Sequence, residues 1–401
     1  MALVIGLNSG SSFDGIDAVL VDIEADVDGY PRRPTFIDGL SHDWPDDIAS
    51  RVRRAFANDL DIFSLTRLNY EAGAVYADAA RTLLEHTGVS ASDVTVIGFD
   101  GQTIYQEPPN RAVPVPSTHD TFVHLWSSGA YPVGLQIGEP SVVASLINIP
   151  VVSQFRPVDH ALGGTGAPLM QFLDFCAFRD VGPVLTLNIG GIANCHLAQA
   201  DRSGMIAFDT GPGNVMIDHA MSHFFGMAYD ADGGVAATGT VDDALLSELL
   251  RHPYFARPIP RSAWRLDFGG DFADQSIAAH PELAPADVVA TFTAFTAHAI
   301  VRSITDNVAA LDSVEEIICS GGGTRNGTLM GMLTALLEPR GVSVVVSDVY
   351  GIPSQFKEAI KFAALAFANV NSMANNIPAA CGASAYSVMG KFVHAPRDAR
   401  V

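Results

Sequence analysis

The sequence predicts an α/β protein built from two duplicated domains. Apolar strands at 3–7 and 184–187 each run into a glycine turn, and a returning strand follows each turn, at 16–24 and 192–200. Both segments carry Leu-Asn-x-Gly followed by Ser or Gly at the turn, which is a weak internal repeat on the scale of a domain. A chain of 401 residues, 48% of them hydrophobic, is long enough for two cores.

The first half continues with strand and helix patterns. The expected elements are a strand-like run at 35–40, helices at 46–58 and 64–87, a buried strand at 94–99, a helix at 141–147 and a strand at 150–155. The segment 107–133 interrupts this pattern with closely spaced prolines, and loops of that length are usually functional or mobile. It is either a lid or interface, or a peripheral insertion.

The polar, glycine-rich segment 156–168 is interpreted as the hinge into the second half. We therefore expect an N-terminal domain over 1–155, completed by the C-terminal segment 375–401, and a C-terminal domain over 156–374. In the second half, a third strand at 205–208 precedes Asp209, and the following residues open a helix. The remaining expected elements are helices at 242–250, 286–308, 327–337 and 355–374 and strands at 315–319 and 343–347.

Composition narrows the class of protein. A formal charge of -21 disfavours nucleic-acid and anionic-membrane surfaces, which need clustered Lys and Arg. The first residues lack a basic signal region, and the longest apolar runs are shorter than the roughly 20 residues that span a bilayer. We expect a soluble, cytoplasmic protein without nucleic-acid or membrane partners. The four cysteines are far apart in apolar runs and are expected to be buried, reduced thiols: Cys176, Cys195, Cys319 and Cys381.

Three glycine turns, at 9–15, 189–191 and 321–323, each follow an apolar strand. The pattern of a P-loop is absent from the sequence, and a single glycine turn is most often structural. Three of them, two on duplicated hairpins and one opening a helix, are typical of a fold that clamps a nucleotide with backbone amides.

Two carboxylates on these loops fit phosphoryl transfer, which needs a cation and a base near the acceptor hydroxyl. Asp14 lies in the first turn, where the alternative is an ordinary Asp-Gly turn. Asp209 follows the third strand of the second repeat, where the alternative is a cap for the helix that begins near Pro212. Three further acids lie at the ends of apolar elements: Asp100, Asp159 and Glu358. Glu358 also lies at the start of an expected helix, where the helix dipole stabilises an acid regardless of function. The twelve histidines are interpreted as scattered, without ligand spacing.

Several segments together resemble the anhydro-N-acetylmuramic acid kinase family of the actin, hexokinase and sugar-kinase superfamily. They follow one another in the family's order over almost the whole chain: GLNSGSSFDGIDAVLV (6–21), GQTIYQEP (101–108), QIGEPSVVA (136–144), VVSQFRPVDHALGGTGAPL (151–169), NIGGIAN (188–194), FDTGPGNVMID (208–218), GGGTRN (321–326) and GIPSQFKEAIKFAALA (351–366).

The resemblance implies two duplicated actin-like (ribonuclease H-like) domains with an ATP- and sugar-binding cleft between them. It implies an enzyme of cell-wall recycling that uses ATP and Mg²⁺, opens the 1,6-anhydro bridge of anhydro-N-acetylmuramic acid with water and phosphorylates O6. Asp209 would be the catalytic base that takes a proton from the water. A homodimer is also implied.

The other roles carried over from the family concern ATP and the sugar. The resemblance places these residues at ATP: Gly10, Ser11, Ser12, Phe13, Asp14, Gly15, Ile16, Asp17, Gly190, Gly191, Gly322, Gly323 and Asn326. Asp14 is also expected to hold the metal ion through water. The residues expected near the sugar are Asn8, Asp100, Thr103, Asp159 and Glu358.

The chain departs from the family pattern on the sugar side. Asn8 stands in place of the usual Met, and an Asn at this position is similar to the pattern of the related levoglucosan kinases. Asp100 replaces the usual His. In PRSAWRLDF (260–268), Trp264 and Leu266 replace Gly and Glu, while Arg261 and Arg265 keep the basic pattern. Levoglucosan or another 1,6-anhydro sugar is therefore the alternative substrate. A non-catalytic actin-like ATPase is disfavoured by the intact FDTGPGN.

Overall fold

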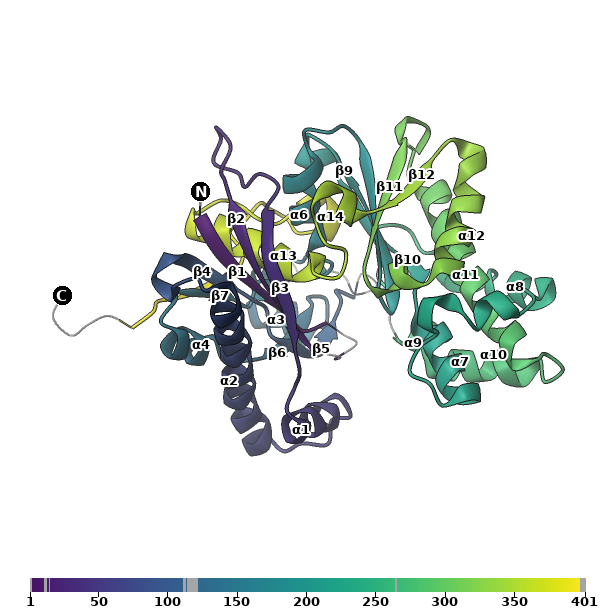
Figure 1. The fold of residues 1–401 in the computed structure, drawn as a ribbon, viewed down its shortest axis with the longest axis horizontal. Coiled ribbons are helices and arrows are strands. Elements are labelled where there is room, and N and C mark those ends of the chain that lie inside the picture. The colour runs from purple at the N-terminus through teal and green to yellow at the C-terminus, as the bar shows by residue number, and fades with distance from the viewer. Residues whose placement is uncertain are drawn as a thin grey trace. The chain divides into compact units, whose positions relative to one another are not determined.

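The computed structural model describes residues 2–10, 13, 15–110, 113, 122–263, 265–309 and 311–396. The chain forms two compact units, both drawn in Figure 1. Unit 1 comprises Met1–Ala177 and Phe356–Val401, and unit 2 comprises Phe178–Gln355. Unit 2 is therefore one continuous stretch of chain, whereas unit 1 is assembled from both ends of the sequence.

Unit 1 is built on a six-stranded sheet with the order β13-β7-β4-β1-β2-β3. β2 pairs antiparallel with both β1 and β3, β4 lies parallel to β1 and to β7, and β13 closes the edge antiparallel to β7. A separate antiparallel hairpin joins β5 and β6. The strands are β1 (Ala2–Asn8), β2 (Ile16–Ile23), β3 (Thr35–His42), β4 (Val94–Gly98), β5 (Gln102–Glu107), β6 (Val133–Ile137), β7 (Val151–Ser153) and β13 (Lys391–Val393).

Helices cover both faces of the unit 1 sheet. Ile5 and Leu7 of β1 share a core cluster with α2, whereas Gly6, which points to the other face, lies against α13. A Cβ on Gly6 would be 2.0 Å from the carbonyl oxygen of Ala359, so only glycine admits α13 at this distance. The helices are α1 (Asp46–Phe56), α2 (Ile62–Thr87), α3 (Phe122–Ser127), α4 (Pro140–Ile147), α5 (Arg156–Ala161), α6 (Met170–Phe178), α13 (Lys357–Val370) and α14 (Pro378–Cys381).

Unit 2 repeats this arrangement with a five-stranded sheet of order β10-β9-β8-β11-β12. β9 pairs antiparallel with β8 and β10, and β11 lies parallel to β8 and β12. The strands are β8 (Val184–Ile189), β9 (Ile192–Ala198), β10 (Ile206–Pro212), β11 (Glu316–Ser320) and β12 (Ser343–Val346). The order and directions match those of β3-β2-β1-β4-β7, so the predicted duplication of an actin-like domain is confirmed.

The helices of unit 2 fall into two sets. α11 and α12 cover the sheet, and α7, α8, α9 and α10 gather around the other end of α11, as Figure 1 shows. α11 is long and apolar enough to cross a membrane, but 83% of its apolar 18-residue stretch is buried inside the fold, as expected for a core helix. The helices are α7 (Val215–Phe225), α8 (Asp243–Leu249), α9 (Arg265–Phe268), α10 (Gly270–Ala279), α11 (Pro285–Asn307) and α12 (Gly327–Leu337).

The residue limits of the two compact units differ from those of the predicted domains. Residues 156–177 and 356–374 were assigned to the second domain from the sequence, yet both stretches lie in unit 1. The reason is packing: α13 lies on β1 and β4, where a Cβ on Gly98 would be 2.1 Å from the carbonyl oxygen of Phe362. In the C-terminal segment, β13 pairs with β7 of the same unit.

Two local predictions also differ from the structure. The third strand of the second repeat, expected at 205–208, runs through Asp209 to Pro212. The segment 107–133, interpreted as one long insertion, includes α3 and the residues that join β5 to β6; its residues 111, 112 and 114–121 lie outside the described chain. The four cysteines are buried and reduced, as predicted.

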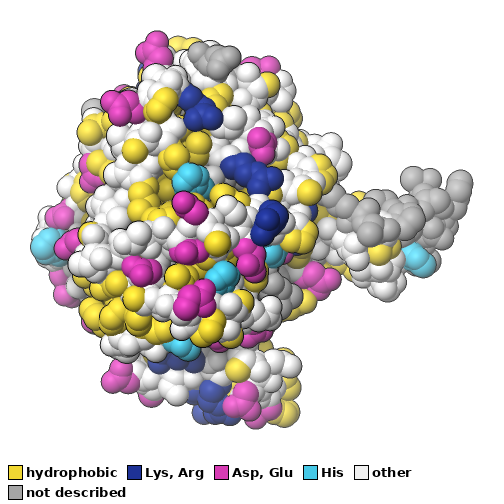
Figure 2. Space-filling model, turned by 90° about the vertical axis from the view of Figure 1, so that its right-hand side faces the viewer, with side chains coloured by type: hydrophobic (Ala, Val, Ile, Leu, Met, Phe, Trp, Pro, Cys, Tyr) yellow, Lys and Arg dark blue, Asp and Glu magenta, His cyan; other side chains and the backbone are white. Residues whose placement is uncertain are grey.

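Acidic side chains are spread over the surface. On the face drawn in Figure 2, Asp and Glu are scattered among apolar and neutral side chains and are more frequent than Lys and Arg. This distribution agrees with the formal charge of -21.

Candidate active site

Asp209 lies inside β10, and its side chain is partly exposed. Its Oδ2 accepts the backbone N–H of Ala263 at 2.7 Å, while its own N–H donates to the carbonyl of Arg261 at 3.0 Å. Because α7 begins only at Val215 and its N-cap residue is Asn214, Asp209 does not cap that helix. The structural alternative considered from the sequence is therefore wrong.

The surroundings of Asp209 favour a base. Burial raises the pKa of its carboxyl group to about 7, and the nearby Asp267 acts in the same direction. The Ala263 N–H and the Arg261 guanidinium oppose this shift in pKa without cancelling it. A carboxylate with a pKa near neutrality takes up a proton far more readily than an ordinary aspartate and is still ionised above that pH.

Arg261 holds the backbone around Asp209. Its Nη1 donates to the carbonyls of Phe255 and Arg257 at 3.1 and 3.0 Å, and its Nη2 donates to Ser303 Oγ at 2.8 Å. Ser303, on α11, in turn donates to the carbonyl of Thr210 at 2.6 Å. The guanidinium is thus fixed by backbone carbonyls and by the Ser303 hydroxyl.

The turn between β8 and β9 is bonded to the start of α7. The carbonyls of Gly190 and Gly191 accept the backbone N–H groups of Gly213, Asn214 and Val215 at 2.8 to 3.1 Å. Gly213 has to be glycine, because a Cβ there would be 2.2 Å from the carbonyl oxygen of Gly190. The predicted phosphate turn and the residues after Asp209 therefore form one connected structure.

Three of the predicted ATP-binding glycines have no internal reason to be glycine. A Cβ would meet no heavy atom within 4 Å at Gly191 or Gly322, and none closer than 3.4 Å at Gly190, and these three residues have no positive φ. Glycine there leaves open space at the backbone, which favours close approach of a ligand. A Cβ on Gly321 would be 2.7 Å from the carbonyl oxygen of Ile189. The turns at 190–191 and 321–323 therefore lie side by side.

Two other predicted ATP-binding residues of unit 2 have clear structural roles. A Cβ on Gly323 would be 2.3 Å from the Ile189 side chain, so packing alone explains this glycine. The buried Asn326 is the N-cap of α12, and its side chain accepts the N–H of Leu329 at 2.9 Å. A contact of either residue with nucleotide stays a prediction.

The first predicted turn lies between β1 and β2 of unit 1. Phe13 is buried, with its ring 5.3 Å from that of Trp44, and Ile16 is fully buried, so neither side chain is available to a ligand. Asp17 accepts a hydrogen bond from Ser41 at 2.6 Å. Gly10 and Asn8 are half-buried, as is Gly15, whose Cβ would be 3.3 Å from the His42 carbonyl. Ser11, Ser12 and Asp14 lie outside the described residues.

Asp100 and Asp159 are both buried and both hold the loop around Gly166. Asp100 accepts the N–H of Phe155 at 2.8 Å and pairs with Arg156 at 2.5 Å, and Arg156 donates to the carbonyl of Gly166 at 2.8 Å. Asp159 accepts the N–H of Gly166 at 2.7 Å and the thiol of Cys381 at 2.9 Å. The structure thus brings these two predicted sugar residues together and shows them bonded within the protein.

Thr103 and Ser9 lie near the start of β5. Thr103 is half-buried and accepts a weak hydrogen bond from Gln136 at 3.4 Å. Ser9 donates to Gln102 at 2.6 Å and accepts from the indole of Trp44 at 3.1 Å. This buried chain joins the first turn to the predicted sugar residues. It was not predicted from the sequence, because its members are far apart along the chain.

Glu358 lies in the first turn of α13, partly exposed, with its carboxylate 3.8 Å from the ammonium group of Lys361. Burial lowers the pKa of Lys361, and the Glu358 charge opposes that shift. Lys357 forms a fully buried ion pair of 2.8 Å with Asp174. These lysines were not assigned from the sequence, although two lysines four apart in an otherwise apolar helix were a usable signal.

Comparisons with known proteins agree with this architecture. The model of the family described as anhydro-N-acetylmuramic acid kinase matches residues 2–115 and 109–395. Proteins of that name from Bacillus cereus (strain AH820) and Bacillus anthracis (strain CDC 684 / NRRL 3495) are each 33% identical over 397 residues, covering 98% of this chain and 99% of theirs. A protein of that name from Bacillus thuringiensis is 32% identical over 397 residues and also covers 98% of this chain and 99% of its own.

Among solved structures, the chain was aligned with the activator of the 2-hydroxyisocaproyl-CoA dehydratase from Clostridium difficile. It is 11% identical, with a TM-score of 0.41, and the match covers 92% of this chain and 96% of that one. The family assignment rests on the sequence matches, which run over nearly the whole chain. The chain belongs to the anhydro-N-acetylmuramic acid kinase family.

Proposed function

We propose that the protein phosphorylates 1,6-anhydro-N-acetylmuramic acid at O6 with ATP while water opens the anhydro bridge. The observation that carries this proposal is the Asp209 carboxylate. It is partly exposed, is held by one backbone N–H, and has a pKa raised to about 7 by burial. A group of this kind is suited to take a proton from water at neutral pH.

In the proposed reaction Asp209 removes a proton from a water molecule, whose oxygen attacks the anomeric carbon of the sugar. The bond from that carbon to O6 breaks, and O6 takes the γ-phosphoryl group of ATP, releasing ADP. Arg261 serves by fixing the backbone on both sides of Asp209, since its donors are bonded to carbonyls and to Ser303.

ATP is proposed to lie against the glycine turns of unit 2. The open space at Gly190, Gly191 and Gly322 supports this, because these glycines have neither a packing nor a φ requirement. Magnesium is proposed from the family resemblance, with Asp14 as its ligand through water. Bound to the phosphates, it would offset negative charge on the transferred group.

The sugar is proposed to contact Asn8, Thr103 and Glu358. Asp100 and Asp159 are proposed to act mainly by holding the loop at Gly166, since their oxygens accept hydrogen bonds from this loop and its neighbours. We also propose a cytoplasmic homodimer. Buried reduced thiols fit a reducing compartment, and the dimer rests on the family resemblance alone.

An ADP-release assay tests the substrate. The protein is given MgATP with anhydro-N-acetylmuramic acid, with levoglucosan or with no sugar, and the sugar product is followed by phosphorus and proton NMR. We expect ADP only with the muramic acid derivative, and a 6-phosphate whose first-formed anomer is α, because water must attack opposite O6. If only levoglucosan is turned over, it replaces anhydro-N-acetylmuramic acid as the proposed substrate. ADP release that does not depend on a sugar would contradict the proposed kinase activity.

A further inference from the structure

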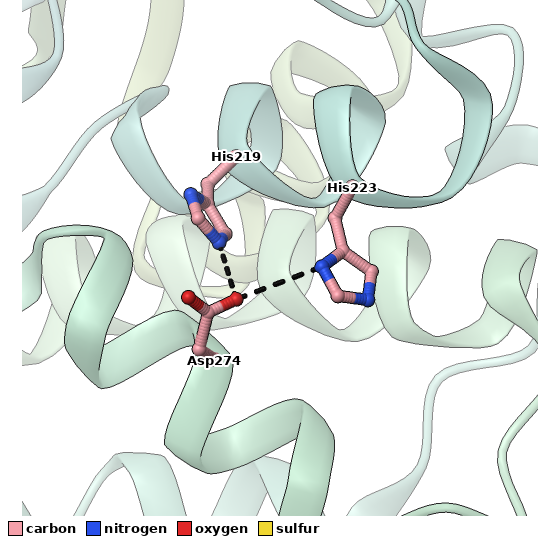
Figure 3. A group of neighbouring side chains, drawn as sticks. All are labelled: His219, His223 and Asp274. Atoms are coloured by element: carbon pink, nitrogen blue, oxygen red, sulfur yellow. Dashed lines mark hydrogen bonds and ion pairs between the residues drawn. The ribbon is translucent and has the colours of Figure 1, made fainter.

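His219, His223 and Asp274 converge in unit 2, outside the proposed catalytic residues. One nitrogen of each imidazole and a carboxylate oxygen lie within 4.8 Å of one another. In Figure 3 both rings point from α7 toward the same oxygen of Asp274 on α10. His219 Nε2 is 2.7 Å and His223 Nδ1 is 3.6 Å from Asp274 Oδ1. This group was not predicted from the sequence, in which the histidines were interpreted as scattered, although His219 and His223 are four residues apart.

We propose that these three residues form a binding site for a divalent transition metal, with Zn²⁺ the preferred ion. Two imidazoles and one carboxylate are a ligand set that Zn²⁺ uses at distances of about 2.0–2.2 Å. Ligand atoms at that distance from a tetrahedral ion are roughly 3.3 Å apart. The two observed separations bracket this value, and all three ligand atoms lie within 4.8 Å of one another, so rotations of the side chains would bring them around one ion.

The backbone around the site is arranged to admit the histidine. Gly270 lies four residues before Asp274 on α10, and a Cβ there would be 3.0 Å from Nδ1 and Cε1 of His219. Glycine thus lets the imidazole lie close against α10. The opposite face of α7 is fixed, because Met216, Ile217, Ala220 and Met221 are buried in the core of this helical cluster. His219 and His223 are therefore presented from a rigid helix.

The site is open to solvent. The side chains of His219, His223 and Asp274 are 28%, 45% and 54% exposed, which leaves room for water as a fourth ligand. Because two ligands come from α7 and one from α10, a bound ion links these helices directly. Binding would therefore stabilise unit 2 against unfolding.

Metal titration of the untagged full chain, freed of metal by a chelator and without nucleotide, tests the proposal. Zn²⁺ binding is measured by calorimetry, Co²⁺ by its visible absorption, and stability by Tm with and without Zn²⁺. The variants are His223→Gln and Asp274→Asn. The matched control is His280→Gln, because His280 also faces two carboxylates, Glu248 at 3.3 Å and Glu282 at 3.5 Å, in a group of three that includes only one histidine.

We expect one Zn²⁺ per chain, a tetrahedral Co²⁺ spectrum and a Tm that rises with Zn²⁺. His223→Gln and Asp274→Asn should each weaken binding by more than about 10-fold, and His280→Gln should bind as the parent chain does. Melting without metal checks that each variant is folded. The proposal is overturned if the parent chain takes up no stoichiometric Zn²⁺, or if either ligand variant binds it unchanged.

Discussion

The hydroxyl group of Tyr254 donates a hydrogen bond of 2.6 Å to the backbone carbonyl of Asp209. The Arg261 guanidinium lies 4.8 Å from the centre of the Tyr254 ring and donates to the same carbonyl at 3.3 Å. Both side chains therefore hold the backbone of Asp209 and leave its carboxylate to react. A base fixed through its backbone keeps its position when its side chain changes protonation state.

Asp209→Asn should abolish turnover while ATP still binds. Asparagine keeps an oxygen that can accept the Ala263 N–H, so the local structure is retained, but it cannot take a proton. We expect kcat to fall on the order of 10³-fold or more and the Kd for ATP, measured by calorimetry, to stay within about 3-fold. Near-normal turnover would remove Asp209 from the role of base.

The rate should fall in acid. Because burial raises the pKa of Asp209 to about 7 and the base acts only when ionised, kcat/KM should drop about tenfold per pH unit below that value. A pH–rate profile between pH 5 and about 9 measures this. An activity that is flat down to about pH 5 would show that the reacting base has an ordinary aspartate pKa.

The same pKa has a consequence for stability. The Asp209 pKa rises from 3.8 to about 7 on folding, so between these values the folded chain holds a proton that the unfolded chain has lost. Stability must fall as pH rises through this window. Asp209→Asn should thus be more stable than the parent chain above pH 7, by on the order of 2–4 kcal/mol, and equally stable below about pH 4. Denaturant unfolding at both pH values checks the sign.

Two glycines of the same turn region should respond in opposite ways to alanine. Gly191→Ala meets no atom within 4 Å, so the protein should keep its Tm while the KM for ATP rises on the order of 10-fold. Gly213→Ala places a Cβ 2.2 Å from the Gly190 carbonyl and should lose about 3 kcal/mol of stability. If Gly191→Ala leaves the KM for ATP unchanged, the open space at this turn does not serve the nucleotide.

Cys381 should matter as a donor to Asp159. Burial and the Asp159 charge raise the pKa of the Cys381 thiol, so it stays protonated and donates at 2.9 Å. Cys381→Ser keeps a donor and should keep activity. Cys381→Ala removes the hydrogen-bond donor from a buried oxygen of Asp159. This variant should lose about 1–3 kcal/mol of stability and have a higher KM for the sugar. Equal kinetics for the two variants would show that the thiol does not position Asp159.

The duplicated sheets were predictable because the alternation of apolar residues and the position of the glycine turns are local properties. Asp209 was predictable for a similar reason, since one short motif contains the strand, the acid and the turn. The domain limits were less accessible. The packing of Gly6 and Gly98 against α13 depends on pairs of residues about 260 to 350 positions apart, and no local pattern records them.

The hydrogen-bond partners of each acid also could not be predicted from the sequence. Tyr254 and Arg261 are 45 and 52 residues from Asp209, and their hydrogen bonds arise only when the segment that carries them packs against β10. Asp159 was predicted to lie near the sugar, but its hydrogen-bond partner Cys381 is 222 residues away and no local pattern indicates it. The pair of histidines on α7 was visible in the sequence, whereas the carboxylate that joins them lies on another helix.

The assembly of unit 1 from both ends of the chain sets an order of events during synthesis. Unit 2 is one continuous stretch and can complete its sheet and core once residue 355 has left the ribosome. The face of β1 and β4 that receives α13 stays uncovered until residues 356–401 follow. The first half of the protein to be made is thus the last to finish folding, and one face of its sheet is exposed during that interval.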